Sequence, residues 1–69
     1  MKEINTVHDA LEHGYKLTHV STDRGYVSRK LKVSDCRVEK YSGKHGEGFK
    51  AFVPNYESTY YCLVHYYTK

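Results

Sequence analysis

Short segments in which apolar and polar residues alternate, separated by turn residues, make up most of this chain. They lie at 15–20, 26–33, 36–41, 49–53 and 59–67, and residues 21–25 between the first two are predicted to form a turn. Alternation with a period of two is typical of β-strands that bury one face. No helical segment that could cross over between parallel strands lies between them. The pattern therefore predicts an antiparallel sheet, or a small open barrel, of four or five strands.

A single short helix is predicted before the strands, at residues 5–14. Asn5 or Thr6 can cap its N-terminus, and Asp9, three residues after Thr6, is typical of a capping box. Gly14 is a common type of residue at the end of a helix. The apolar face consists of Val7, Ala10 and Leu11. Because a helix of about two turns is not stable alone, we expect this face to pack on the sheet.

The length of 69 residues limits the chain to one hydrophobic core. We therefore expect a single α+β domain over residues 1–69, with the helix at 5–14 and a β-rich part at 15–68. Residues 59–67 carry apolar side chains on both strand faces, which favours a central place in the sheet. Barrel enzymes and doubly wound nucleotide-binding folds, which need about 200 residues or more, are excluded.

The N-terminal segment carries acidic residues and no apolar stretch, so we expect no signal peptide. The longest apolar run, residues 60–64, is far shorter than the ~20 residues of a membrane-spanning helix. These features favour the cytoplasm, where Cys36 and Cys62 would be reduced and buried. A disulfide between them would require that their strands be neighbours. No CxxC motif is present, which excludes a zinc ribbon.

Positive charge is concentrated in the middle of the chain. Residues 16–50 contain nine Lys and Arg against four Asp and Glu, whereas residues 1–15 have a net charge of −2 and the whole chain +3. An uneven basic surface attracts polyanions, with an affinity that falls as the salt concentration rises. We therefore expect a phosphate-bearing ligand, and an ordinary solvated basic face is the alternative.

The segment at 24–30 combines positive charge with an aromatic ring. On a strand, Tyr26, Ser28 and Lys30 line one face, where they can stack on a base and hold a phosphate. Arg29 lies on the opposite, apolar face, so its guanidinium must either leave the core or meet an anion.

The segment at 43–48 is rich in glycine. Glycines allow successive backbone N–H groups to point at an anion, and Lys44 adds a positive charge. The segment fits neither a Walker A nor a dinucleotide-binding motif, and a flexible connection between strands is the alternative. Tyr41, just before it, is expected to stack on a base. The two segments and this tyrosine give eight candidate ligand-binding residues: Arg24, Tyr26, Ser28, Arg29, Lys30, Tyr41, Lys44 and His45.

Tyrosine supplies eight of the ten aromatic residues. On the last strand, one face carries Tyr61, Leu63, His65 and Tyr67, and the other carries Tyr60, Cys62, Val64 and Tyr66. We expect one set in the core and the other as a stacking platform or a protein interface, since tyrosine suits both. Core packing of both sets is the alternative.

Patterns typical of catalysis are weak. His8 and Glu12 are helical neighbours, as are Asp9 and His13, but no HExxH motif or third metal ligand accompanies them. Both cysteines occupy apolar strand positions with no group to activate them. A domain of this size rarely encloses a catalytic pocket. We therefore expect a non-enzymatic protein without metal or cofactor.

Three segments, RGYVSRK, YSGKHGEGF and PNYESTYY, on a chain of this length resemble small accessory proteins encoded by phages and prophages of Gram-positive bacteria. The resemblance implies a role in the host cytoplasm: blocking a defence complex, sequestering a nucleotide signal or binding nucleic acid. It assigns no residue. The function that we expect is binding of nucleic acid or nucleotide through the basic, tyrosine-containing surface. The alternative is inhibition of a host defence or regulatory complex through the tyrosine-rich face. Unpaired strand edges also favour a homo-oligomer.

Overall fold

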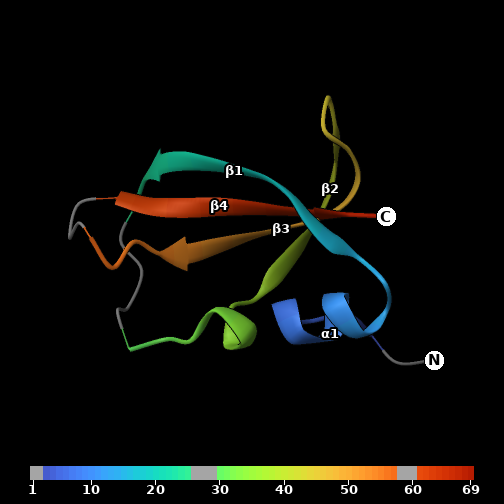
Figure 1. Cartoon of the computed structure of the whole chain (residues 1–69), viewed down its shortest axis with the longest axis horizontal. Coiled ribbons are helices and arrows are strands. Elements are labelled where there is room, and N and C mark those ends of the chain that lie inside the picture. The colour runs from blue at the N-terminus through green and yellow to red at the C-terminus, as the bar shows by residue number, and fades with distance from the viewer. Residues whose placement is uncertain (1–2, 26–29, 58–60) are drawn as a thin grey trace.

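Four antiparallel strands form one sheet among the residues that the structure describes. The computed structural model describes residues 3–25, 30–57 and 61–69, without the side chains of Asp23 and Arg24. The elements are α1 (Val7–Glu12), β1 (Lys16–Arg24), the 3-10 helix η1 (Val33–Asp35), β2 (Val38–Gly43), β3 (Gly46–Pro54) and β4 (Tyr61–Thr68). The strands lie in the order β1-β4-β3-β2, and every neighbouring pair is antiparallel (Figure 1). The predicted α+β class with an antiparallel sheet is confirmed.

Local signals set both ends of α1. The Thr6 side chain accepts a hydrogen bond from the Asp9 backbone at 3.3 Å, and the Asp9 carboxylate accepts one from the Thr6 N–H at 3.2 Å. At the C-terminal end, Gly14 has a φ of 89°. The backbone N–H groups of Gly14 and Tyr15 donate to carbonyl oxygens in the last turn of the helix. The predicted capping box and glycine stop are confirmed, although the helix is shorter than 5–14.

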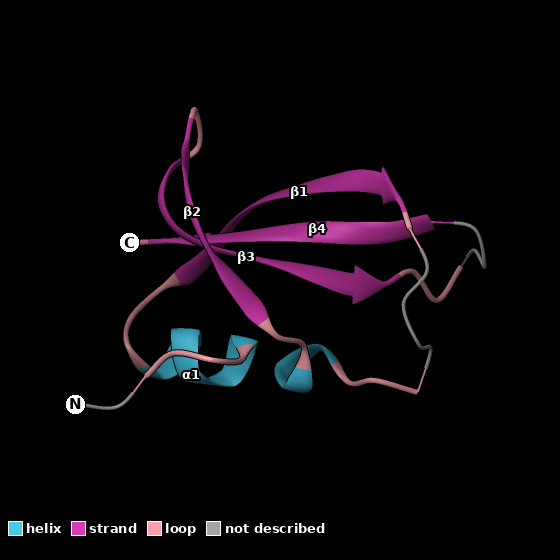
Figure 2. Ribbon diagram, turned by 180° about the vertical axis from the view of Figure 1, so that it is seen from behind, coloured by secondary structure: helices cyan, strands magenta, loops and turns pink. Residues whose placement is uncertain are grey.

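The core lies between α1, η1 and the sheet, and Figure 2 shows both helices on the same side of the strands. Its buried residues are Val7, Cys36, Ala51, Val53 and Tyr67. Ala10 is also buried, but Leu11 is 49% exposed. The prediction that Leu11 packs on the sheet is therefore wrong. In so short a helix, Val7 and Ala10 fill the side that faces the core, and Leu11 falls at its margin.

The largest differences from the predicted strands lie at 21–33. In addition, β2 begins and ends two residues later than the predicted 36–41, and β3 extends beyond 49–53 at both ends. The turn predicted at 21–25 is wrong over its first four residues, because β1 pairs with β4 up to Arg24. Cross-strand packing overrides the polar composition there. In place of the strand predicted at 26–33, residues 30–33 form a turn, an irregular stretch and the start of η1, and residues 26–29 lie outside the described residues. The central place predicted for the last strand is confirmed, because β4 lies between β1 and β3.

A tight hairpin replaces the flexible connection considered for the glycine-rich segment. β2 and β3 pair as far as Gly43 and Gly46, so that Lys44 and His45 alone form the turn. Gly46 has a φ of 103°, a conformation that glycine adopts without strain at such a position. The glycine-rich sequence therefore serves to close the hairpin.

Both cysteines are buried free thiols, as predicted. Cys36 packs in the core. The side chain of Cys62 lies on the face of β4 opposite to that of the core residue Tyr67. Among the described residues, no helix has the length and apolar character needed to cross a membrane.

Candidate ligand-binding site

Four aromatic rings form a cluster on the face of the sheet that points away from α1. His19 comes from β1, Tyr41 from β2, Tyr66 from β4 and His45 from the turn between β2 and β3. The imidazole rings of His19 and His45 stack, with centroids 3.9 Å apart and 20° between their planes. The Tyr66 ring lies 5.6 Å from His19, 5.1 Å from His45 and 4.8 Å from Tyr41. We call these four residues the ring cluster.

A β-bulge places His19 in the ring cluster. The pairing of β1 with β4 shifts after Leu17, so that His19 rather than Thr18 lies opposite Tyr66. In regular pairing, His19 would point to the other face of the sheet. The Thr18 hydroxyl donates to the Tyr66 carbonyl oxygen at 3.3 Å and lies 2.9 Å from the Thr68 hydroxyl. These hydrogen bonds fasten the bulge, and the bulge turns the imidazole toward the ring cluster.

The β2–β3 hairpin supplies the other half of the ring cluster. Tyr41 alternates with Lys40 and Ser42 along β2, so its ring lies on the opposite face from theirs. Figure 1 shows that the tip of the hairpin extends beyond β4 and β1 on the side away from α1. The turn therefore carries His45 across the sheet to His19, although the two residues lie far apart in the sequence.

Positive charge lies close to the ring cluster. Lys44 precedes His45 in the turn, Lys50 pairs with Tyr66 across β3 and β4, and Lys16 begins β1 opposite Thr68. Partial removal from water lowers the pKa of His45 below its ordinary 6.5, and the charges of His19 and Lys44 lower it further. The His45 imidazole is therefore mainly neutral at pH 7, when its ring stacks on that of His19.

Part of the sequence-predicted site comes together here. Tyr41 and His45 belong to the ring cluster, and Lys44 lies beside them. The sequence reasoning missed His19, because nothing in the sequence marks a bulge. For Tyr66, alternation along the last strand predicted a face shared with Cys62 and Val64, and left open whether this face or that of Tyr67 belongs to the core.

Two of the other predicted site residues belong to described backbone segments away from the ring cluster. Arg24 lies at the opposite end of β1 from the hairpin turn, where its backbone pairs with Tyr61. Lys30 is exposed in the turn before η1. The remaining three, Tyr26, Ser28 and Arg29, lie outside the described residues.

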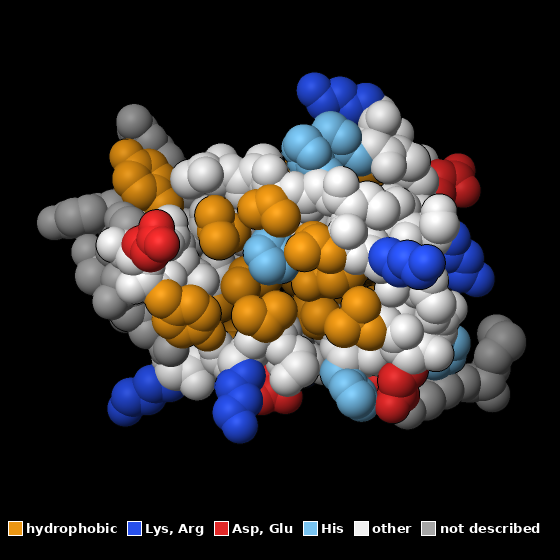
Figure 3. Space-filling view, in the orientation of Figure 1, with side chains coloured by type: hydrophobic (Ala, Val, Ile, Leu, Met, Phe, Trp, Pro, Cys, Tyr) orange, Lys and Arg blue, Asp and Glu red, His pale blue; other side chains and the backbone are white. Residues whose placement is uncertain are grey.

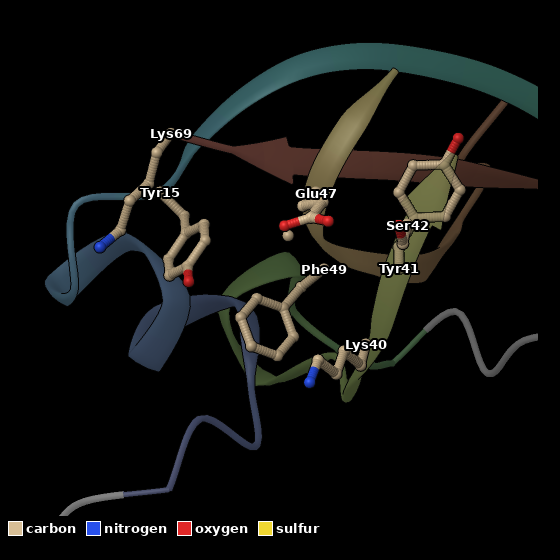
Figure 4. A pocket seen from close by; sticks show the side chains of 8 residues that line it. Tyr15, Lys40, Tyr41, Ser42, Glu47, Phe49 and Lys69 are labelled. Atoms are coloured by element: carbon tan, nitrogen blue, oxygen red, sulfur yellow. The ribbon is translucent and has the colours of Figure 1, made fainter. Parts of the chain in front are cut away.

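A pocket of about 640 Å³ lies on the other face of the β2–β3 hairpin (Figure 4). The rings of Tyr15 and Phe49 meet edge to face at 5.1 Å, and the Lys69 ammonium lies 5.1 Å from the Tyr15 ring centroid. Lys40 lines the same pocket, and Figure 4 shows the Glu47 carboxylate within it, whereas the Tyr41 ring points away. Because one carboxylate stands between two ammonium groups, the pocket favours no single class of ligand.

The cysteines and the metal-ligating side chains of the described part are a separate candidate for chemistry. No group of three or more His, Cys, Asp and Glu that could hold a metal ion occurs among these residues. Burial, and then the Asp35 carboxylate, raise the pKa of the Cys36 thiol, which donates to the Lys32 carbonyl oxygen at 3.4 Å. The thiol is therefore protonated and a poor nucleophile.

No family model, no curated protein and no solved structure matches this chain.

Proposed function

We propose that this protein is a non-enzymatic binding module for a phosphate-bearing ligand, nucleic acid or nucleotide, and that the ring cluster holds the ligand. The observation that carries the proposal is the meeting of four aromatic rings with nearby lysines on one face of the sheet. In the setting that the phage resemblance implies, this ligand would be met in the host cytoplasm.

The ring cluster and its lysines have the two parts of a single-strand binding surface. Bases stack on aromatic side chains at about 1–3 kcal/mol per base, and basic side chains follow the backbone phosphates. His19 is exposed, and Tyr41, His45 and Tyr66 are half-buried, so that each ring is fixed by its neighbours and still partly open. Preordered rings lose little conformational entropy when a base stacks on them.

The test is the affinity for a fluorescently labelled single-stranded oligothymidine, measured by anisotropy over a range of salt concentrations. We expect log Kd to rise linearly with log salt. Lys44→Gln should weaken binding and reduce the slope by ~0.7, the value for one lost phosphate contact with a single strand. Lys32→Gln removes the same charge from the exposed residue before η1 and is the matched control. Absence of binding at low salt, or equal losses for both variants, would contradict the proposal.

A second candidate function is protein binding, which is favoured by an apolar field on the α1 side of β1 and β4. Leu17 is 48% and Val20 44% exposed, and the register places both on the same face as Tyr61. Figure 3 shows apolar side chains gathered over β1, β4 and β3 around a histidine, with both basic and acidic side chains at the rim. A contiguous exposed field of this kind is typical of interaction sites.

A second copy of this chain is the partner that we infer for the apolar field. The field borders β1, which is an edge strand of the sheet formed by the described residues and can pair with a copy of itself. Sedimentation should then show a dimer that Leu17→Asp dissociates. Leu11→Asp places the same charge at an equally exposed leucine of α1 and should leave the dimer intact. A wild-type monomer at every concentration would exclude the second copy, and leave a host protein as the partner to seek.

A further inference from the structure

The stacked pair of His19 and His45 is unusual because both imidazoles can carry a proton. Their ring centroids are 3.9 Å apart, closer than any other pair of rings in the ring cluster. Two protonated imidazoles at this separation would repel each other strongly, since little water fits between stacked rings. A second proton on the stacked pair is therefore disfavoured in the protein alone.

Most of the described charged or titratable groups on this face of the sheet are basic or phenolic, and Glu39 of β2, which lies opposite Lys50, is acidic. Tyr41 of β2 and Tyr66 of β4 contact the pair with their rings, and Lys44 adjoins His45 in the turn. Lys16 and Lys50 lie on the same face of the sheet, from β1 and β3. Glu47, the nearest acid along the chain, lines the pocket on the other face (Figure 4). Glu39 is paired across the strands with Lys50, and Lys16, Lys44 and Lys50 outnumber it, so that the charged groups named here are net positive.

We propose that the His19–His45 pair takes up protons when a phosphate-bearing ligand binds the ring cluster, so that the affinity rises as the pH falls. The inference rests on the proposed function and adds its regulation. A phosphate group placed beside the stack supplies the negative charge that the pair lacks. It can accept a hydrogen bond from each imidazolium, and hydrogen bonds between charged groups are the strong ones.

The direction of the effect follows from linkage. Burial and neighbouring positive charges hold the pKa of His45 below 6.5 in the protein alone. A bound phosphate opposes both positive charges and raises this pKa. At a pH between the His45 pKa of the free protein and that of the complex, the complex binds more protons than the free protein. Lowering the pH therefore favours the complex. The affinity should therefore change with pH mainly in the range in which an imidazole titrates.

The test measures the Kd of labelled oligothymidine at constant ionic strength from about pH 8 to about pH 5.5, the range in which histidine titrates. We expect the wild-type affinity to rise by more than tenfold over this range. Calorimetry in two buffers that differ in ionisation enthalpy should show a net uptake of protons on binding. His19→Phe and His45→Phe keep a ring for stacking and should each flatten the pH profile, and the double variant should abolish it.

His8→Gln is the matched control, because His8 lies on α1, away from the ring cluster, and pairs with Glu12 at 2.9 Å. It should keep the wild-type pH profile. Circular dichroism confirms that each variant is folded at the pH values used. Binding that is equally tight at every pH would overturn this inference and leave the proposed function intact. Absence of binding at every pH would overturn both.

Discussion

At the scale of single residues, the ring cluster depends on Thr18. Its hydroxyl bonds to the Tyr66 carbonyl oxygen and to the Thr68 hydroxyl, and these contacts fasten the bulge that turns His19 toward His45. The residue that positions the site is thus a small polar one that takes no part in stacking. Bulges commonly re-aim a side chain in this way beside functional sites.

Thr18→Val tests this dependence, because valine keeps the β-branched shape and lacks the hydroxyl. We expect a loss of about 1 kcal/mol in the free energy of unfolding, the usual size of a hydrogen-bond effect. Oligothymidine binding should weaken as well, because His19 is less firmly held. Urea unfolding and anisotropy measure the two effects. Thr22→Val, at another exposed position of β1, should change neither, and similar losses in both variants would contradict the role of the bulge.

At the scale of elements, α1 closes the core with two side chains. Val7 is 1% exposed and Ala10 is fully buried, whereas Leu11 lies half in solvent. The Val7 N–H donates to the carbonyl oxygen of Cys36, just after η1, at 2.9 Å, and the N–H of Val38, the first residue of β2, donates to the Asn5 carbonyl oxygen at 3.1 Å. The helix is therefore attached to the sheet through both packing and hydrogen bonds.

Val7→Ala should cost about 2 kcal/mol, because it removes two buried methyl groups and leaves a cavity. Leu11→Ala should cost less than about 0.5 kcal/mol, since exposed substitutions have small effects. Chemical denaturation of the two variants gives both values. A larger loss for Leu11→Ala than for Val7→Ala would show that α1 packs on the sheet through a different face.

The elements also show how much the sequence alone could predict. The capping box of Thr6 and Asp9 is a local signal, and so is the apolar character of β4 on both faces, so that the helix start and the central strand were predicted correctly. The bulge after Leu17 and the extension of β1 to Arg24 arise from pairing with a distant strand. Local patterns carry no information on such pairing. For the same reason Tyr41, Lys44 and His45 were predicted as site residues, whereas His19 was not.

At the scale of the whole molecule, buried titratable groups limit the pH range of stability. Burial lowers the pKa of His65, whose Nδ1 lies 3.2 Å from the Tyr67 hydroxyl. The pKa of His45 is lowered as well. Burial raises the pKa of Tyr67 and of Cys36. The folded protein therefore favours the neutral form of all four groups, and the unfolded chain has no such preference.

We expect the Tm to fall as the pH drops below about 6.5, because the unfolded chain then binds protons that the folded histidines do not. It should fall again above about pH 9, where the unfolded chain ionises its cysteines and then its tyrosines. Melting curves across this range measure both limits. For His65→Gln, the decrease in Tm from pH 7.5 to the acid range should be smaller than the same decrease for the wild type. An unchanged acid limit would contradict the assignment to His65.

The most direct test of the central claim is a map of the residues that respond to the ligand. In heteronuclear NMR spectra of labelled protein titrated with single-stranded oligothymidine, we expect the largest shifts at His19, Tyr41, Lys44, His45 and Tyr66. Residues of the apolar field, such as Leu17 and Val20, and of the pocket, such as Tyr15 and Phe49, should change little. Shifts centred on the apolar field or the pocket, or no shifts at low salt, would contradict the assignment of the ring cluster as the ligand-binding site.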